Sequence, residues 1–149
     1  MKSIFNAADN QEVVARIGKL STDSKGQWGK MNVEQMLVHC QVPLEVALGE
    51  LKLKRGLVGF LFGKMAKKSF TGPKPFKRNL PTDPNFLVRK SENFEKEKQK
   101  LSQLVARLGQ AGPMGVTQEP HPFFGKLTGQ EWDLLMYKHL DHHLTQFGV

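Results

Sequence analysis

The chain has 149 residues, a net charge of +8 and a single cysteine. This length fits one domain, residues 1–149, whose core is large enough to fold without disulfides or structural metals. Cys40 alone excludes an internal disulfide and a cysteine-rich zinc site and favours a reducing compartment. Residues Met1 to Asp9 show no signal-peptide pattern and no apolar run is long enough to span a bilayer, so we expect a cytoplasmic protein.

The positive charge is concentrated in one segment, residues 51–82. It contains nine Lys or Arg and no Asp or Glu, which leaves a net charge of −1 for the rest of the chain. A local contact with an anionic partner fits this distribution better than a protein coated by nucleic acid. A solvated basic face is the alternative. An anionic membrane, nucleic acid and an acidic protein fit the nine cations about equally well, and contact with nucleic acid or membrane is not the leading expectation.

Hydrophobic spacing predicts an all-α fold, because no stretch shows the sustained alternation of a strand. The first helix is expected at Gln11–Leu20, with Asp9 or Asn10 as its N-cap. The second begins after the N-cap Asn32 and carries an apolar stripe that reaches Leu51. The second helix contains a proline, Pro43, which predicts a kink or a wider turn.

Three more helical segments follow. Leu57–Phe70 is expected to be a short helix broken by glycine, and its apolar residues fit a core or a dimer interface better than a membrane surface. The proline-rich stretch Thr71–Pro84 is expected to be an extended connection. The fourth helix is expected at Ser91–Leu108, and the fifth runs from a capping box at Thr128 to about Phe147.

The fifth predicted helix carries His139 and His143 on one face. Residues at i and i+4 have Cβ atoms about 5–6 Å apart, so these two imidazoles can converge on one ion. Both lie beside the apolar stripe, where a pocket between helices would be lined. His39 lies in a similar place beside the stripe of the second helix. The spacing alone can also arise by chance.

Three neutral imidazoles fit a catalytic metal site better than a structural one, because catalytic sites leave one position open for water or substrate. The metalloprotease motif His-Glu-x-x-His is absent, since Leu140 follows His139. Asp141 is expected to point away from the histidine face as a solvated acid. The sequence therefore identifies no general base.

The motif Trp28-Gly-Lys-Met-Asn-Val-Glu-Gln-Met-Leu-Val-His39, followed by Trp132 and His139-x-x-x-His143, resembles the DinB-like superfamily. The C-terminal part, from His121-Pro-Phe-Phe-Gly through the last helix, is similar to a branch of small proteins within it. The resemblance covers most of the chain. It implies a DinB-like four-helix bundle of the up-down-down-up type with one additional short helix.

The same resemblance implies a divalent metal, most often zinc or nickel, held by His39, His139 and His143. Some relatives are transferases that join a low-molecular-weight thiol such as bacillithiol, mycothiol or glutathione to an electrophile. Others resemble thiol-using isomerases, and many have no known activity.

Other candidate residues receive structural interpretations. His142 also shares a face with His139, but the family pattern favours His143 as the ligand. His121 is expected to be structural, with a place at a pocket mouth as the alternative. Cys40 is expected to be an inert buried thiol rather than a nucleophile. Trp28 and Trp132 are expected in the core, although either could wall a pocket.

Two functions follow from these patterns. The leading one is a metal-dependent enzyme, a thiol-dependent transferase or a hydrolase acting on a small-molecule substrate. The alternative is a non-catalytic interaction module whose segment 51–82 contacts an anionic partner. Bundles of this size commonly dimerise, so a homodimer is one option, while oligomeric state, substrate and reaction stay open.

Overall fold

The computed structural model describes residues 2–81 and 93–149, which contain five helices and no strand. The predicted all-α class is therefore confirmed for these residues. The helices are α1 (Ala7–Gly18), α2 (Val33–Ala47), α3 (Leu57–Phe70), α4 (Phe94–Ala111) and α5 (Gly129–Gln146). Within the described ranges, no helix is both long enough and apolar enough to cross a bilayer.

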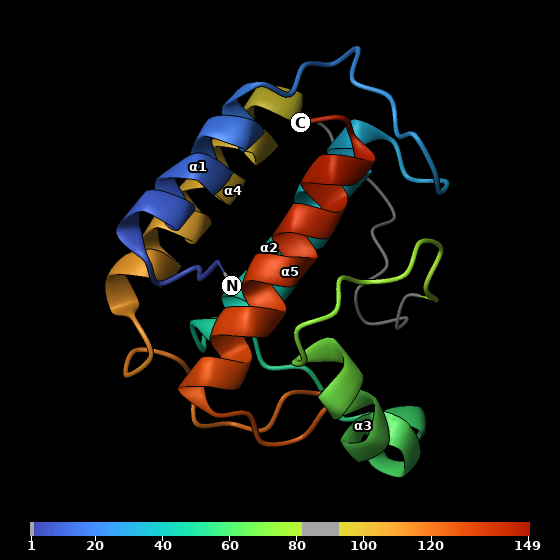
Figure 1. The fold of residues 1–149 in the computed structure, drawn as a ribbon, viewed down its shortest axis with the longest axis vertical. Coiled ribbons are helices and arrows are strands. Elements are labelled where there is room, and N and C mark those ends of the chain that lie inside the picture. The colour runs from blue at the N-terminus through green and yellow to red at the C-terminus, as the bar shows by residue number, and fades with distance from the viewer. Residues whose placement is uncertain (1, 82–92) are drawn as a thin grey trace.

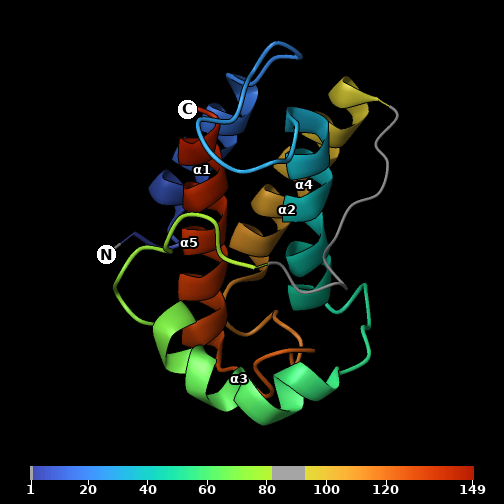
Figure 2. The same cartoon turned by 90° about the vertical axis from the view of Figure 1, so that its right-hand side faces the viewer.

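Four of the helices surround one core. Helix α1 packs on α4 and α5, and α2 packs on the same two helices. Following the chain in Figure 1, α1 and α5 run upward while α2 and α4 run downward. Helix α3 lies across one end of this group, as Figure 2 shows. The core is filled by large side chains that are almost wholly buried: Ile17, Met36, Leu37, Leu44, Leu101, Leu108, Trp132, Met136, Leu140 and Leu144.

The helix starts follow from side-chain caps. The predicted N-cap of α1 is wrong, because Asn6 accepts hydrogen bonds from the backbone of Ala8 and Asp9 and starts the helix earlier. Asn10 is instead buried and donates to the carbonyls of Ile4 and Val105. The capping boxes predicted at the starts of α2 and α5 are both present.

Some predicted boundaries differ from the structure. Helix α2 passes through Pro43 as one continuous helix and ends before Leu51. Helix α4 begins at Phe94, and the start predicted at Ser91 lies outside the described residues. The break expected in α3 is wrong, because Gly59 and Gly63 lie inside a continuous helix.

The two glycines of α3 bring the backbone of this helix against the loop before α5. A Cβ on Gly63 would lie 1.8 Å from the carbonyl oxygen of Phe123, and one on Gly59 would lie 2.8 Å from the Cα of Phe123. Only glycine allows so close an approach of two backbones. Tertiary packing therefore explains residues that local propensity identifies as helix breakers.

Candidate metal centre

Three histidines meet where α2 packs against α5. His39 comes from α2, while His139 and His143 come from successive turns of α5. One nitrogen from each ring can be chosen so that all three lie within 4.8 Å of one another. The Nε2 atoms of His39 and His139 are 3.0 Å apart. Helical spacing thus accounts for His139 and His143 on one face of α5, and the packing of α2 on α5 brings His39 to them.

The cluster is largely shielded from solvent. His39 and His143 are 5% and 8% exposed, and His139 is partly buried. Burial lowers the pKa of His143 to about 3, and the neighbouring His39 contributes to this shift. Burial also lowers the pKa of His139 well below its usual value, with further contributions from His143 and His39. The two rings on α5 are therefore neutral near pH 7, and neutral imidazole is the form that binds metal ions.

Gln146 fixes the tautomer of His143. Its side-chain Nε2 donates to the backbone carbonyl of Trp28 at 2.6 Å, and this carbonyl can only accept. The amide oxygen of Gln146 must then face His143 Nδ1, which lies 2.8 Å away. Nδ1 therefore carries the proton, and the Nε2 of His143 keeps a free lone pair. Hydrogen bonds of this kind orient histidine ligands in metal sites.

The contact between His39 and His139 needs a proton or a cation between their nitrogens, and the N–H of a neutral imidazole can supply that proton. Two nitrogen lone pairs only 3.0 Å apart repel each other unless a proton or a cation is shared between them. The Nδ1 of His139 is also buried and has no hydrogen-bond partner among the described residues. A buried polar atom without a partner costs about 1–3 kcal/mol. An ion held at Nε2 would not contact Nδ1, so this cost is separate from metal binding at the contact between His39 and His139.

The donor spacing fits a metal ion. Ligands about 2.0–2.1 Å from one zinc ion lie at most about 4 Å apart. The three donors fall within 4.8 Å, so ring movements of less than about one ångström would close them on an ion. Imidazole nitrogen is a ligand that zinc, nickel, cobalt and copper all accept.

The remaining histidines lie outside the cluster. The ring of His142 faces Trp28 and Phe76, with centroids 5.7 and 5.9 Å away. His121 is buried, and its Nδ1 accepts hydrogen bonds from the backbone of Phe123 and Phe124. His121 therefore organises the loop before α5, as its structural interpretation predicts.

The other candidate residues also receive clear places. Cys40 is 1% exposed and burial raises the pKa of its thiol, which fits an inert cysteine. Asp141 is partly exposed, but it binds Arg16 at 2.7 Å and so links α5 to α1. Trp132 is fully buried in the core, whereas Trp28 is partly exposed beside His142.

Sequence reasoning missed two residues near the cluster. Gln146 lies three positions after His143, so helical spacing could have indicated their contact. Arg78 lies over the ring of Trp28, with its guanidinium carbon 4.2 Å from the ring centroid. No local pattern indicates this second contact, because the two residues are brought together by the fold. Trp28, Phe76, Arg78 and His142 form a group of rings and one cation next to the cluster, which we call the aromatic rim.

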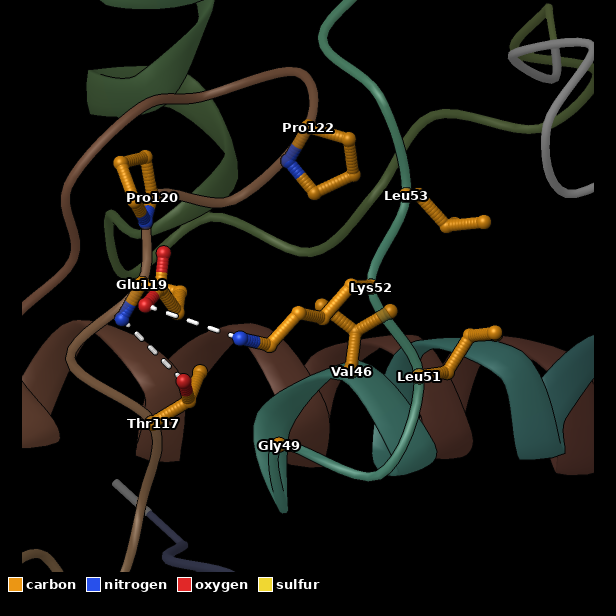
Figure 3. Close-up of a pocket in the computed structure, with 9 residues that line it drawn as sticks. All are labelled: Val46, Gly49, Leu51, Lys52, Leu53, Thr117, Glu119, Pro120 and Pro122. Atoms are coloured by element: carbon orange, nitrogen blue, oxygen red, sulfur yellow. Dashed lines mark hydrogen bonds and ion pairs between the residues drawn. The ribbon is translucent and has the colours of Figure 1, made fainter.

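A small hollow lies elsewhere, between the end of α2 and the loop before α5 (Figure 3). Its volume is about 70 Å³, and its lining contains no histidine. Lys52 and Glu119 form an ion pair at this hollow with an N–O distance of 3.9 Å. A liquid water occupies about 30 Å³, so the space suits a couple of waters rather than a substrate.

Fold and site together define an all-α protein with a buried three-histidine cluster. A family model described as "Protein of unknown function (DUF1569)" matches residues 2–148, and the chain therefore belongs to this family. Comparisons with curated proteins and with solved structures give no significant match. The family description names no activity, so the argument for function depends on the geometry.

The burial of His121 predicts a pH-dependent stability. Burial lowers its folded-state pKa to about 3, whereas an unfolded histidine has a pKa near 6.5. Between these values only the unfolded chain binds the proton, so the free energy of unfolding falls as the pH drops. In His121→Asn, the slope of unfolding free energy against pH between about pH 4 and 6 should be shallower by about 1.4 kcal/mol per pH unit.

Urea unfolding at several pH values measures this slope. Asparagine retains an acceptor for the backbone of Phe123, which limits the loss of structure. His142→Asn is the comparison, because burial lowers the pKa of the partly exposed His142 less strongly than that of His121 and Asp141 opposes the shift, so its slope should change less. Equal slopes in wild type and His121→Asn would contradict the prediction.

Proposed function

We propose that His39, His139 and His143 bind one divalent metal ion, zinc or nickel, and that the protein is a metal-dependent enzyme. The observation that carries this proposal is the convergence of three imidazoles in a buried contact, with His143 oriented by Gln146. Three protein ligands leave a coordination position for water or substrate, which is typical of catalytic sites. A structural zinc site would usually supply a fourth protein ligand.

The helix directions support a DinB-like arrangement. The up, down, down, up order of α1, α2, α4 and α5 in Figure 1 is the order that the resemblance implies, and α3 is the additional helix. The three histidines also occur in the sequence order of that superfamily. These two agreements favour a thiol-dependent transferase as the activity, with a hydrolase as the second candidate.

A bound divalent ion would supply Lewis acidity that lowers the pKa of a thiol or a water molecule. The residues of the chain would hold and orient the reactants. Arg78 in the aromatic rim offers a cation to a carboxylate of the thiol, and Trp28 and Phe76 offer apolar faces to the electrophile.

The proposed transfer is a substitution at carbon and needs no oxidant or reductant. The thiol sulfur forms a bond to the electrophilic carbon, and the leaving group departs with the electron pair of the bond that breaks. The thiol proton is released to solvent. In the hydrolase alternative, water replaces the thiol as the nucleophile.

Metal binding tests the ligand set. Purified chain without a histidine tag should bind about one Zn²⁺ or Ni²⁺ when the metal-free protein is titrated by calorimetry. His39→Ala, His139→Ala and His143→Ala should each lose this binding, because each removes one of three ligands. His142→Ala should retain it, which makes this neighbouring histidine on the same helix a matched control.

The variant Gln146→Met, titrated in the same way, tests whether the hydrogen bond from His143 to Gln146 contributes to metal binding. It should weaken metal affinity by about 10- to 100-fold, the usual effect of removing a hydrogen bond to a ligand. Gln41→Met is the matched control, since Gln41 is equally buried but donates to Glu97 on α4. Absence of metal from the wild type, or equal binding by all variants, would exclude the proposed site.

Activity is measured separately with metal-loaded protein. Bacillithiol or glutathione together with chlorodinitrobenzene should yield the thiol adduct at a rate that His143→Ala abolishes and Gln41→Met largely retains. Hydrolysis of a nitrophenyl ester without thiol would favour the second candidate. If metal-loaded protein is inactive toward both substrate classes, the cluster binds metal without the proposed chemistry.

A further inference from the structure

Helix α3 carries most of the large hydrophobic side chains that are exposed in the described residues. Six of the eight large hydrophobic side chains that are exposed in the described residues belong to it. We call these six the α3 face: Leu57, Val58, Phe60, Leu61, Phe62 and Met65, which are 82%, 62%, 66%, 68%, 52% and 76% exposed. A contiguous apolar surface of this kind marks an interaction site in a protein that is otherwise well packed.

These side chains point outward because the opposite side of α3, which carries two glycines, packs closely against the protein. Gly59 and Gly63 lie against the backbone of Phe123 at distances that leave no room for a Cβ. Rotating α3 to bury its large residues would push side chains into that backbone. The glycines therefore set the seating of α3 and leave its apolar residues facing out.

The C-terminal end of α3 is also held in place. Lys138 on α5 is 7% exposed and donates to the carbonyls of Ser69, Phe70 and Gly72 at 3.2, 2.8 and 2.8 Å. A cation at a helix C-terminus stabilises the carbonyls that have no partner within the helix. Lys67 adds an ion pair with Glu131 at 2.8 Å. Helix α3 is thus seated at both its middle and its end.

Basic residues accompany the α3 face. Leu57, Leu61, Lys64 and Lys68 follow the spacing i, i+4, i+7 and i+11, so they share one outward stripe of the helix. Lys54 and Arg55 lie exposed just before the helix begins. The segment 51–82 contains no acid, and among the described residues no carboxylate pairs with Lys54, Lys64 or Lys68.

From this arrangement we propose that the α3 face docks onto an anionic phospholipid bilayer surface. Apolar side chains of an interfacial helix enter the boundary of headgroups and acyl chains, while lysines extend along their aliphatic stems to reach phosphate and carboxylate headgroups. An acid-free stripe of leucine and lysine supplies both contacts from one side of α3. The proposal stands apart from the metal site, which lies between α2 and α5.

A second copy of the chain or a nucleic acid fits the leucines and lysines of this stripe less well than a bilayer does. In a dimer formed through this face, Lys64 and Lys68 would meet either the same lysines or the leucines of the second copy, and no acid in segment 51–82 would neutralise them. A nucleic acid would neutralise the lysines but leave the α3 face without an apolar partner. A bilayer meets both requirements.

Vesicle flotation tests the proposal. The full chain should float with vesicles of phosphatidylcholine containing about one third phosphatidylglycerol at about 0.15 M salt, where generic surface attraction is screened over about 8 Å. It should bind pure phosphatidylcholine vesicles at least about tenfold more weakly, because the headgroup contacts of several lysines are lost.

Two paired variants separate the apolar and basic contributions. Lys64→Gln/Lys68→Gln should weaken binding by about 25-fold, the effect expected of two lysines near the surface. Leu57→Ser/Leu61→Ser should weaken it by at least about tenfold. The matched controls are Lys19→Gln/Lys25→Gln, which removes the same charge from exposed positions elsewhere, and Met114→Ser, which removes an exposed hydrophobic side chain. Both controls should bind as the wild type does.

Further measurements on the same variants test whether they fold and whether a second copy or nucleic acid binds the α3 face instead. All variants should retain the wild-type circular dichroism spectrum and metal affinity, since the changed residues are exposed. The proposal is overturned if the wild type ignores anionic vesicles or if the controls lose binding as strongly as the α3 variants do. A dimer that Leu57→Ser/Leu61→Ser dissociates would assign the face to a second copy, and DNA binding that only the lysine variant loses would assign it to nucleic acid.

Discussion

The contact between α2 and α5 is the constraint on which the rest of the site depends. It places His39 opposite His139 and His143 in a region from which solvent is largely excluded. Removing the imidazoles of His139 and His143 from water lowers their pKa values and keeps these rings in the neutral form that binds metal ions. Gln146 then selects the tautomer of His143, and the carbonyl of Trp28 fixes the orientation of Gln146.

Much of this site could be predicted from the sequence, and the remainder shows what tertiary packing adds. Helical spacing alone paired His139 with His143, because residues four apart share a face. His39 could be joined to them only through a family resemblance, since it is 100 residues from His139. The link from Gln146 to Trp28 spans 118 residues and has no local pattern at all. The N-cap Asn6 was missed because Asp9 and Asn10 offered equally suitable caps nearer the apolar residues.

In helix α3 the local sequence predicts a break that the folded structure does not have. Its glycines predicted a break, because glycine lowers helix propensity. In the folded chain they are the contact surface, and the helix is kept by its seating against Phe123 and by Lys138. The same glycines explain why the apolar residues of α3 face away from the core of this chain. A metal centre between helices and an apolar, basic face at the end of the molecule are therefore separate features with separate structural causes.

A structure from crystals grown with Zn²⁺ or Ni²⁺ tests most directly whether the three histidines bind one metal ion. With diffraction data collected at the absorption edge of the metal, one anomalous peak should lie between α2 and α5. Its distances to nitrogens of His39, His139 and His143 should be about 2.0–2.1 Å for zinc. The absence of a peak there, with the Nε2 atoms of His39 and His139 still 3.0 Å apart, would instead show that a shared proton joins these rings and would contradict the account.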